Sequence, residues 1–194
     1  MFYSKKNQKI YKMFYQNYIK SLFDKLLALG LILIGFLPFF LIFLIIFFES
    51  KKLSKIFFLQ LRVGKNEKMF YIYKFRTMNE DKDTNQNLLH DSIRTTKIGF
   101  FLRKTHLDEL PQIIQIFLGK ISFVGPRPLL PEYLQLYTPL QALRHNVLPG
   151  MTGWAQINGG ADLPLDQKAD LDAWYVQNIS FLLDLKILWK TFFR

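Results

Sequence analysis

An adjacent pair of carboxylates, Asp108 and Glu109, is the part of the sequence whose residue types best suit chemistry. Neighbouring carboxylates can hold a divalent cation, and an ionised carboxylate can act as a nucleophile. Apolar residues with helical spacing lie on both sides of the pair, and Pro111 either begins the second helix or kinks a single one. An acidic pair before a helix is also a common cap, so the pair alone leaves a structural role open.

Basic residues in two nearby segments suit the binding of a phosphate or diphosphate. Arg103 and Lys104 precede the acidic pair, and we expect their charge to favour the ionised form of Asp108, which is the attacking form. Lys74 and Arg76 lie two residues apart at the end of a β-rich segment, so in a strand they share one face. A solvated strand edge is the simpler interpretation of such a pair.

A further basic position lies in a rigid corner of the chain. Arg127 stands between Pro126 and Pro128, which fix their own φ angles and push Arg127 towards an extended conformation. A guanidinium held in one direction suits bidentate contact with a phosphate. The alternative is a structural proline turn with the arginine in solvent.

An acidic residue, Asp172, lies on the inward face of a helix that we expect over residues 166–177. It shares that face with Leu165, Ala169 and Val176. A carboxylate among apolar residues is costly unless it is paired. Asp172 therefore faces a bound cation, an arginine of the site, or the partner of a structural salt bridge.

The elements that must position these residues are mostly helical. Alternating residues over 57–63, turn residues at 64–67 and the aromatic stretch 69–75 predict a β-hairpin. Residues 121–128 are expected to form a short strand that leads into a rigid corner, and helices are expected over 132–143, 166–177 and 181–194. The polar segment 79–95 predicts a mobile surface loop that could act as a lid.

The last expected helix carries a basic stripe. Lys186, Lys190 and Arg194 follow one another at intervals of four residues, and apolar residues cover the remainder of the helix. This pattern fits an amphipathic helix in the membrane interface. A core helix with one wet edge is the competing interpretation.

An uncharged stretch over residues 26–48 predicts a membrane segment. As one helix it would measure roughly 35 Å, enough to cross a hydrocarbon core of about 30 Å. Pro38 lies near its middle and weakens a helix there, and both flanks are basic, which marks both ends as cytoplasmic. A re-entrant helix broken at Pro38 satisfies both observations, whereas a single kinked span with ambiguous flanks is the alternative.

Composition narrows the classes of partner. Half of the 194 residues are hydrophobic, and the net charge is +11. This balance suits anionic lipid head groups and phosphorylated substrates, and beside a membrane segment these are better partners than nucleic acid. The absence of cysteine excludes disulfides and thiolate metal sites.

Several segments keep an order and spacing that resemble a known family. They are KFRTM (74–78), LRKTHLDELPQ (102–112), SFVGPRPLLPEY (122–133), RHNVLPGMTGWAQING (144–159) and YVQNISFLLDLKIL (175–188). Together they resemble the bacterial sugar transferases, and more closely the small monotopic phosphoglycosyl transferases that start glycan assembly on a polyprenyl phosphate. The resemblance runs from about Phe23 to Leu188.

The resemblance implies an activity and roles for the residues above. It implies transfer of a sugar 1-phosphate from a UDP-sugar to undecaprenyl phosphate, with release of UMP and a requirement for Mg²⁺. By position, Asp108 matches the nucleophile that forms a covalent phosphosugar intermediate, and Glu109 matches its metal-linked partner. Lys74, Arg76 and Arg127 match basic positions near the phosphates.

The resemblance also sets the expected architecture. The expected fold class is mixed α/β and mostly helical, with a short hairpin and interfacial amphipathic helices. We expect a basic and aromatic interfacial arm at 1–25, a re-entrant membrane helix at 26–48 and a catalytic domain at 49–194. The implied location is the cytoplasmic face of the bacterial inner membrane, with a monotopic arrangement. Expected partners also include anionic membrane lipid and downstream glycosyltransferases, and exclude nucleic acid.

A non-catalytic, membrane-anchored module is the alternative from another class. Its basic surface would bind anionic lipid or a partner transferase, and it would need neither the acidic pair nor Mg²⁺. An enzyme of the same chemistry with a different lipid acceptor is a further alternative. The chain departs from the family pattern at Leu37, Lys120, Leu148 and Gly160, and these departures concern the substrate more than the type of reaction.

Overall fold

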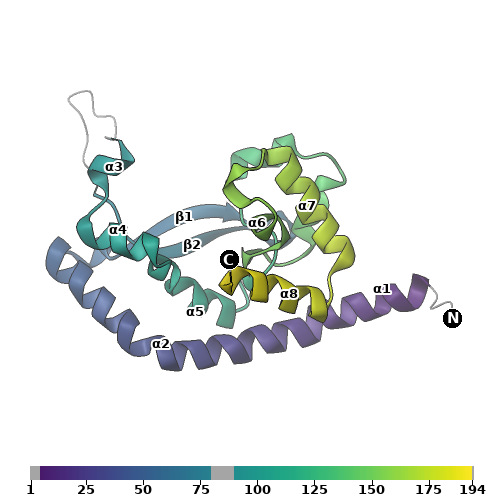
Figure 1. Cartoon of the computed structure of the whole chain (residues 1–194), viewed down its shortest axis with the longest axis horizontal. Helices are drawn as coiled ribbons and strands as arrows, with labels where there is room; N and C mark the ends of the chain where they lie inside the picture. Colours follow the sequence, from purple (N-terminus) through teal and green to yellow (C-terminus); the bar gives the residue numbers. More distant parts are fainter. Residues whose placement is uncertain (1–4, 80–89, 194) are drawn as a thin grey trace. The chain divides into compact units, whose positions relative to one another are not determined.

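The computed structural model describes residues 5–79 and 90–193 and is mostly helical, with two small sheets (Figure 1). Its α-helices are α1 (Lys5–Phe14), α2 (Lys20–Ser50), α3 (Asp91–Arg94), α4 (Lys97–Lys104), α5 (Pro111–Phe117), α6 (Trp154–Ile157), α7 (Leu165–Asn178) and α8 (Phe181–Phe192). Its strands are β1 (Phe57–Val63), β2 (Met69–Phe75), β3 (Ser122–Val124) and β4 (Gly150–Thr152). The mixed, mostly helical character and the hairpin are thereby confirmed, the latter because β1 and β2 pair in one sheet.

The described residues form two compact units. Unit 1 comprises residues from 1–29, 61–71 and 115–194, and unit 2 comprises residues from 30–60 and 72–114. Helix α2 and the β1–β2 hairpin contribute residues to both units. Each unit has its own buried interior.

The core of unit 2 is an aromatic and aliphatic cluster. Ile46 of α2, Phe75 of β2 and Leu102 of α4 are all buried in it. The rings of Phe57 and Phe75 stack with their centroids 5.5 Å apart. Because successive residues of a strand face opposite sides, burial of Phe75 turns its neighbour Lys74 towards the other face.

The turn between α4 and α5 presents the acidic pair. Thr96 caps α4 by accepting a hydrogen bond from the backbone N–H of Gly99 at 2.9 Å. His106 has a left-handed backbone, with φ of 57°, and a short 3₁₀ turn over Leu107–Glu109 follows it. Pro111 then begins α5, where its missing N–H removes no helical hydrogen bond. The structure therefore selects the interpretation with two helices over the single kinked helix.

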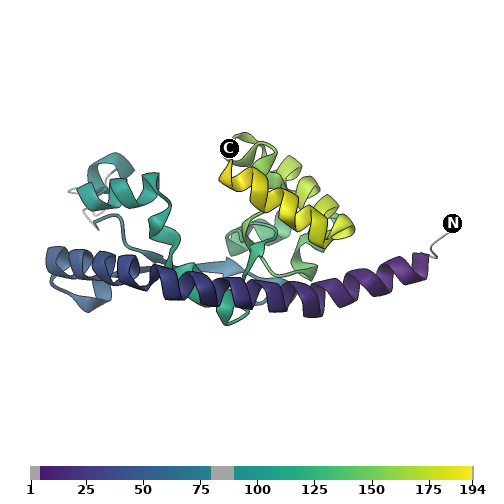
Figure 2. The same cartoon turned by 60° about the horizontal axis from the view of Figure 1, so that its bottom comes forward.

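The core of unit 1 is built around a short parallel sheet. Strand β3 pairs with β4 so that Ser122 lies opposite Gly150 and Val124 lies opposite Thr152. A Cβ atom on Gly150 would lie 2.1 Å from the backbone nitrogen of Gly125, so only glycine permits this approach. Helix α8, yellow in Figure 2, packs against both strands and against α6.

A buried polar network in unit 1 connects the N-terminal helical segment to α8. The carboxylate of Asp184 accepts hydrogen bonds from Tyr15 at 2.7 Å and from Tyr175 at 2.7 Å, and it pairs with Lys20 at 2.6 Å. These side chains are buried, so the carboxylate is satisfied by partners rather than by water.

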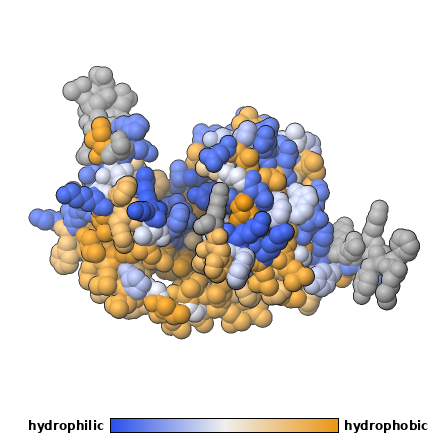
Figure 3. Space-filling view, viewed as in Figure 1, coloured by the Kyte–Doolittle hydropathy of each residue, from blue (hydrophilic) through white to orange (hydrophobic). Residues whose placement is uncertain are grey.

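The N-terminal half of the chain contains one helical stretch, Ile10–Ser50, that is long and apolar enough to cross a membrane by length and composition. Only 11% of its most apolar window is buried within the protein. Large apolar residues of α2 are exposed, and Figure 3 shows apolar side chains gathered along this helix. A helix with so little protein cover suits a lipid environment.

Pro38 lies inside α2, which stays helical from Lys20 to Ser50. The proline therefore does not end the helix, although it removes one helical hydrogen bond. The re-entrant path of residues 26–48 and the cytoplasmic position of the remaining chain stay predictions.

Two local expectations need correction. Asp91–Arg94 forms α3 rather than part of a loop, because Arg94 pairs with Asp91 at 2.8 Å and the backbone of Asn79 donates to the carbonyl of Arg94 at 2.8 Å. The remainder of the expected loop, residues 80–89, lies outside the described residues. The expected helix over 132–143 is replaced by separate 3₁₀ segments at Pro131–Leu136 and Gln141–Asn146.

Candidate active site

A cavity of about 640 Å³ in unit 2 brings together most of the predicted site residues. Asp108 comes from the turn between α4 and α5, Lys74 and Arg76 from the end of β2, and Arg103 from α4. The other lining residues are Phe58, Gln60, Phe75, Thr77, Met78, Asn79, Asp91 and Arg94. A cavity of this size holds a small organic molecule, and its cations suit an anionic one.

Asp108 is buried, with 8% of the residue exposed. Burial raises the pKa of this carboxyl above its ordinary value, and the charge of Lys74 is the largest effect that lowers it. Glu109 raises the pKa of Asp108 further by like-charge repulsion, and Arg103 lowers it slightly. Nearby cations favour the ionised form as predicted, since Lys74 and Arg103 both lower this pKa. The net shift is nevertheless upward, because desolvation outweighs their attraction.

Glu109 is fixed by an ion pair. Its carboxylate oxygen Oε1 lies 2.5 Å from the ammonium of Lys74, and both side chains are mostly buried. The lysine therefore neutralises Glu109 and at the same time attracts the neighbouring Asp108. His106, directly before the turn that carries Asp108 and Glu109, adopts the left-handed conformation. Backbone strain of this kind is concentrated at functional sites.

The other predicted cations of unit 2 line the same cavity with different contacts. Arg103 donates from Nε to the hydroxyl of Thr77 at 2.9 Å. Arg76 donates to the backbone carbonyl of Phe57 at 3.3 Å. Both guanidiniums are thus oriented by the end of the hairpin, and a guanidinium can bind a phosphate through two parallel N–H groups.

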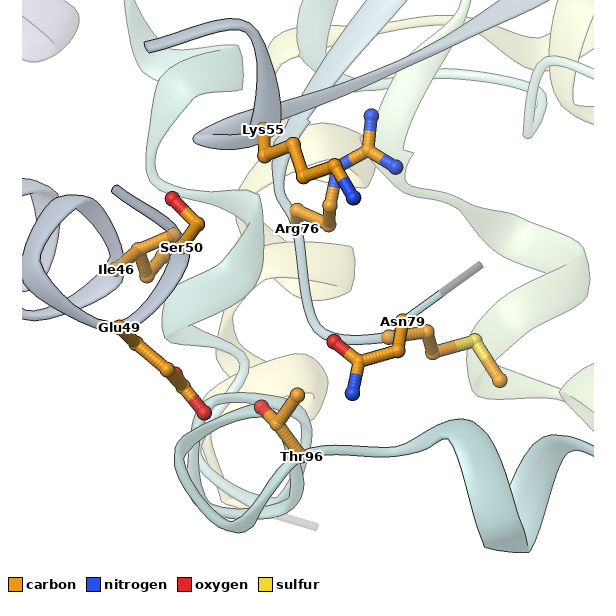
Figure 4. Close-up of a pocket in the computed structure, with 8 residues that line it drawn as sticks. Ile46, Glu49, Ser50, Lys55, Arg76, Asn79 and Thr96 are labelled. Atoms are coloured by element: carbon orange, nitrogen blue, oxygen red, sulfur yellow. The ribbon is translucent and has the colours of Figure 1, made fainter. Parts of the chain in front are cut away.

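Arg76 also lines a second cavity of unit 2, with a volume of about 360 Å³. Figure 4 shows Lys55 and Arg76 at this cavity together with Glu49 and Ser50 from the end of α2. Asn79 and Thr96 complete its polar lining. The segment from Arg76 to Asn79 thus contributes to both cavities.

Arg127 and Asp172 belong to unit 1 and are not among the residues that line the cavity with Asp108. The side chain of Arg127 is exposed, and its backbone carbonyl accepts a hydrogen bond from Arg144 at 2.7 Å. Burial lowers the pKa of Arg62, and the charge of Arg127 lowers it further, so these two cations repel each other within unit 1.

Asp172 forms a buried ion pair, which is one of the alternatives that its sequence position left open. Its carboxylate lies 2.9 Å from the guanidinium of Arg144, and each side chain is only 2% exposed. Burial raises the pKa of Asp172 to about 6, although Arg144 lowers it. Arg144 also donates to the hydroxyl of Tyr137 at 2.6 Å, so this ion pair stabilises the packing of α7 against the preceding segment.

Three functional or structural residues escaped the sequence interpretation. Arg94 lines the large cavity, but the polar segment around it indicated only a surface loop. Arg144, the partner of Asp172, carries no local signal. Asp184 did carry a local sequence signal, because a lone carboxylate inside the apolar run FLLDLKIL predicts a buried partner.

Asp108 and Glu109 are also the candidate ligands for a metal ion. The described residues contain no group of three or more His, Cys, Asp or Glu side chains with metal-binding geometry. Mg²⁺ is commonly held by one or two carboxylates, with waters and substrate phosphates as the remaining ligands. The acidic pair therefore fits an ion that binds together with a phosphorylated substrate.

Comparison with known proteins places the chain in a family. The sequence model of the family described as bacterial sugar transferase matches residues 15–194. The chain is 49% identical over 173 residues to the uncharacterized sugar transferase EpsL of Bacillus subtilis (strain 168), covering 89% of this chain and 85% of that protein. It is 37% identical over 190 residues to the exopolysaccharide production protein ExoY of Sinorhizobium fredii, covering 89% of this chain and 83% of that protein.

A longer relative carries a named activity. The chain is 37% identical over 190 residues to the UDP-glucose:undecaprenyl-phosphate glucose-1-phosphate transferase of Klebsiella pneumoniae. The match covers 92% of this chain but only 40% of that enzyme. The family match spans nearly all of the described residues, including the acidic pair and the cations around it, and the chain therefore belongs to the bacterial sugar transferase family.

Proposed function

We propose that this protein is a phosphoglycosyl transferase that moves a sugar 1-phosphate from a UDP-sugar to undecaprenyl phosphate and releases UMP. The observation that carries the proposal is the cavity in which the buried Asp108 lies among Lys74, Arg76 and Arg103. Both substrates are phosphate anions that repel each other, and cations at the site offset that repulsion. The names of several relatives, among them the Klebsiella pneumoniae enzyme, include undecaprenyl phosphate as acceptor and support the same reaction class.

The proposed reaction has two displacements at one phosphorus atom. An oxygen of the Asp108 carboxylate attacks the phosphorus that carries the sugar, and the bond from this phosphorus to the oxygen of UMP breaks. The sugar phosphate is then held on the enzyme as an acyl phosphate. A phosphate oxygen of undecaprenyl phosphate attacks the same phosphorus, and the carboxylate leaves unchanged.

The residues around Asp108 have separate roles in this scheme. Lys74 keeps Glu109 neutralised and lowers the pKa of the nucleophile, which burial raises. Arg76 and Arg103 bind the phosphate oxygens of the donor, where charge is delocalised during transfer. Mg²⁺, held by Asp108 and Glu109 together with substrate phosphates, would supply charge stabilisation of the kind that metal ions give phosphoryl transfer.

The location of the reaction follows from the lipid acceptor. Undecaprenyl phosphate is confined to the bilayer, so the cavity must lie near the head groups. The apolar stretch Ile10–Ser50 provides the membrane attachment. We propose that residues 26–48 enter the bilayer, bend at Pro38 and leave on the same face, and that the remaining chain lies on the cytoplasmic face of the inner membrane. Exposed apolar residues of α8, such as Leu182 and Phe192, then lie in the membrane interface.

The deciding experiment supplies the purified protein in lipid nanodiscs with undecaprenyl phosphate, Mg²⁺ and a panel of UDP-sugars. Release of UMP with one member of the panel, together with a lipid-linked sugar diphosphate, is the expected result. Absence of UMP with every donor would favour the non-catalytic membrane module. UMP release without a lipid product would point to an acceptor other than undecaprenyl phosphate.

A further inference from the structure

Arg94 is a cavity-lining cation whose hydrogen-bonding capacity is only partly used. Its side chain is 13% exposed and lines the cavity that holds Asp108. One terminal nitrogen lies 2.8 Å from the carboxylate of Asp91, and the other donates to the carbonyl of Asn79 at 3.5 Å, the long limit for such a bond. The Nε atom is buried and has no hydrogen-bond partner within the described residues.

This arrangement differs from that of an arginine with a purely structural role. A guanidinium presents five N–H donors in a rigid fork, and a buried donor without a partner is unfavourable. The carboxylate that Arg94 contacts is itself well exposed, so water competes with the ion pair. The edge of the fork that includes Nε therefore offers a bidentate site for an oxyanion.

The backbone fixes where this fork lies. The N–H of Asn79 donates to the carbonyl of Arg94 at 2.8 Å, and Met78 bridges to Thr95 in antiparallel fashion. These contacts attach α3 to the chain segment that follows β2. Lys74 lies in β2, and Arg76 directly follows it. The cations of β2 and the guanidinium of Arg94 thus line one cavity.

We propose that Arg94 binds the diphosphate of the nucleotide-sugar donor, and that Asp91 holds the guanidinium in place until the donor binds. This inference rests on the proposed function for the identity of the donor. The donor diphosphate carries two negative charges where the carboxylate carries one, and water already competes for the exposed Asp91. Phosphate oxygens that take both Nε and a terminal nitrogen can therefore replace it. Donor binding thereby supplies the partner that the buried Nε lacks.

The test compares Arg94→Gln with two other variants of the full chain in nanodiscs. Arg94→Gln removes the charge and the fork, so the KM for the donor is expected to rise by about 10-fold or more, as for loss of a charged hydrogen bond. The KM for undecaprenyl phosphate is expected to change much less. Lys97→Gln is the matched control, because Lys97 is exposed, lies on the next helix and is not among the cavity-lining residues.

Asp91→Asn separates donor binding from a structural clamp. If Arg94 only clamps α3 through its ion pair, this variant raises the donor KM as much as Arg94→Gln, and the proposal is overturned. If Arg94 binds the donor, Asp91→Asn lowers the donor KM, because a competing anion is removed. A thermal midpoint for each variant confirms that the protein compared is folded.

Direct binding of UDP, measured by calorimetry on the same nanodiscs, keeps the inference distinct from the proposed reaction. Wild-type protein that binds UDP through Arg94 without turning over any UDP-sugar would overturn the proposed function and leave the inference intact. Wild-type protein that turns over a donor, while Arg94→Gln keeps both the donor KM and the affinity for UDP, would overturn the inference alone.

Discussion

Replacing Asp172 by asparagine should change how the stability of the protein depends on pH. The carboxyl is buried beside Arg144, and burial raises its pKa to about 6 from an ordinary value of 3.8. The folded protein therefore holds this proton more tightly than the unfolded chain does. The resulting stabilisation is fully present below about pH 4 and is lost as the pH rises through about 6.

The size of the effect follows from the two pKa values. A difference of about 2 in pKa corresponds to about 3 kcal/mol of unfolding free energy. For a chain of this length that free energy is worth about 6–12 °C in the unfolding temperature. The asparagine variant has no proton to lose at this position. The unfolding free energy of the wild type minus that of the variant should therefore fall by about 3 kcal/mol between pH 4 and pH 7.

The assay is thermal unfolding in detergent at a series of pH values, followed by tryptophan fluorescence. Trp154 and Trp174 stack with their ring centroids 4.7 Å apart, and Trp174 lies on α7 with Asp172, so the signal reports on this region. A difference that stays constant, or one that grows with pH, would refute the reasoning. It would mean that attraction by Arg144 outweighs desolvation.

A second variant and an activity measurement complete this test. Arg144→Met removes the one contact that lowers the pKa of Asp172, so the pH-dependent loss of stability should extend to higher pH. Arg144→Met should also lower the unfolding free energy by about 3–5 kcal/mol, because the buried Asp172 loses its charged partner. Loss of UMP release by a folded Asp172→Asn protein would restore the predicted role of this residue at the substrate.

Three further outcomes are expected. Asp108→Asn should abolish the burst of UMP that precedes addition of the acceptor, and it should abolish the trapping of radiolabelled sugar on the protein. Turnover of this variant at the wild-type rate would exclude the two-step mechanism at Asp108. Arg127→Lys should reduce activity far more than Lys186→Gln, because a point charge does not replace a guanidinium held between two prolines, and small, equal losses would count against a phosphate role. In intact cells, single cysteines at Lys12 and Lys65 should both be protected from a reagent added outside, and Pro38→Ala should weaken that protection. External labelling of either site without the Pro38 substitution would exclude the re-entrant path.

The sequence predicted the elements whose signals are local. Alternation and turn residues located the β1–β2 hairpin, because strand period acts over a few residues. Pro111 gave the start of α5 as one of two alternatives, between which the structure decides. The acidic pair and the cations of β2 and α4 were found for the same reason. The meeting of Asp108 with these cations in one cavity was expected only from the resemblance.

The long-range pairings could not be predicted from the sequence. Tyr15 and Asp184 are 169 positions apart, and nothing near either residue identifies its partner. The same holds for Asp172 with Arg144. The role of Arg94 was hidden because its neighbours are polar. Backbone contacts of Met78 with Thr95 and of Asn79 with Arg94 fix α3 beside the end of β2, and no sequence pattern shows them.

The net direction in which the cavity shifts the pKa of Asp108 could not be predicted from the sequence either. The cause of this shift leads to a final prediction. Charge counting along the sequence favours the ionised carboxylate, whereas burial makes that form costly. Nucleophilic attack requires the ionised form, so the burst rate should rise with pH as Asp108 loses its proton, over a range above that of an exposed carboxyl.

Lys74 and Glu109 should move that pH range in opposite directions. Lys74→Met removes the largest effect that lowers the pKa of Asp108, so the rising limb should shift to higher pH. Glu109→Gln removes a like charge, so the limb of its residual burst should shift to lower pH, even though loss of the metal-linked carboxylate reduces the rate. Shifts of the same sign in both variants would show that the limb reports a group other than Asp108, because only a carboxyl next to both charges responds to their removal with opposite sign.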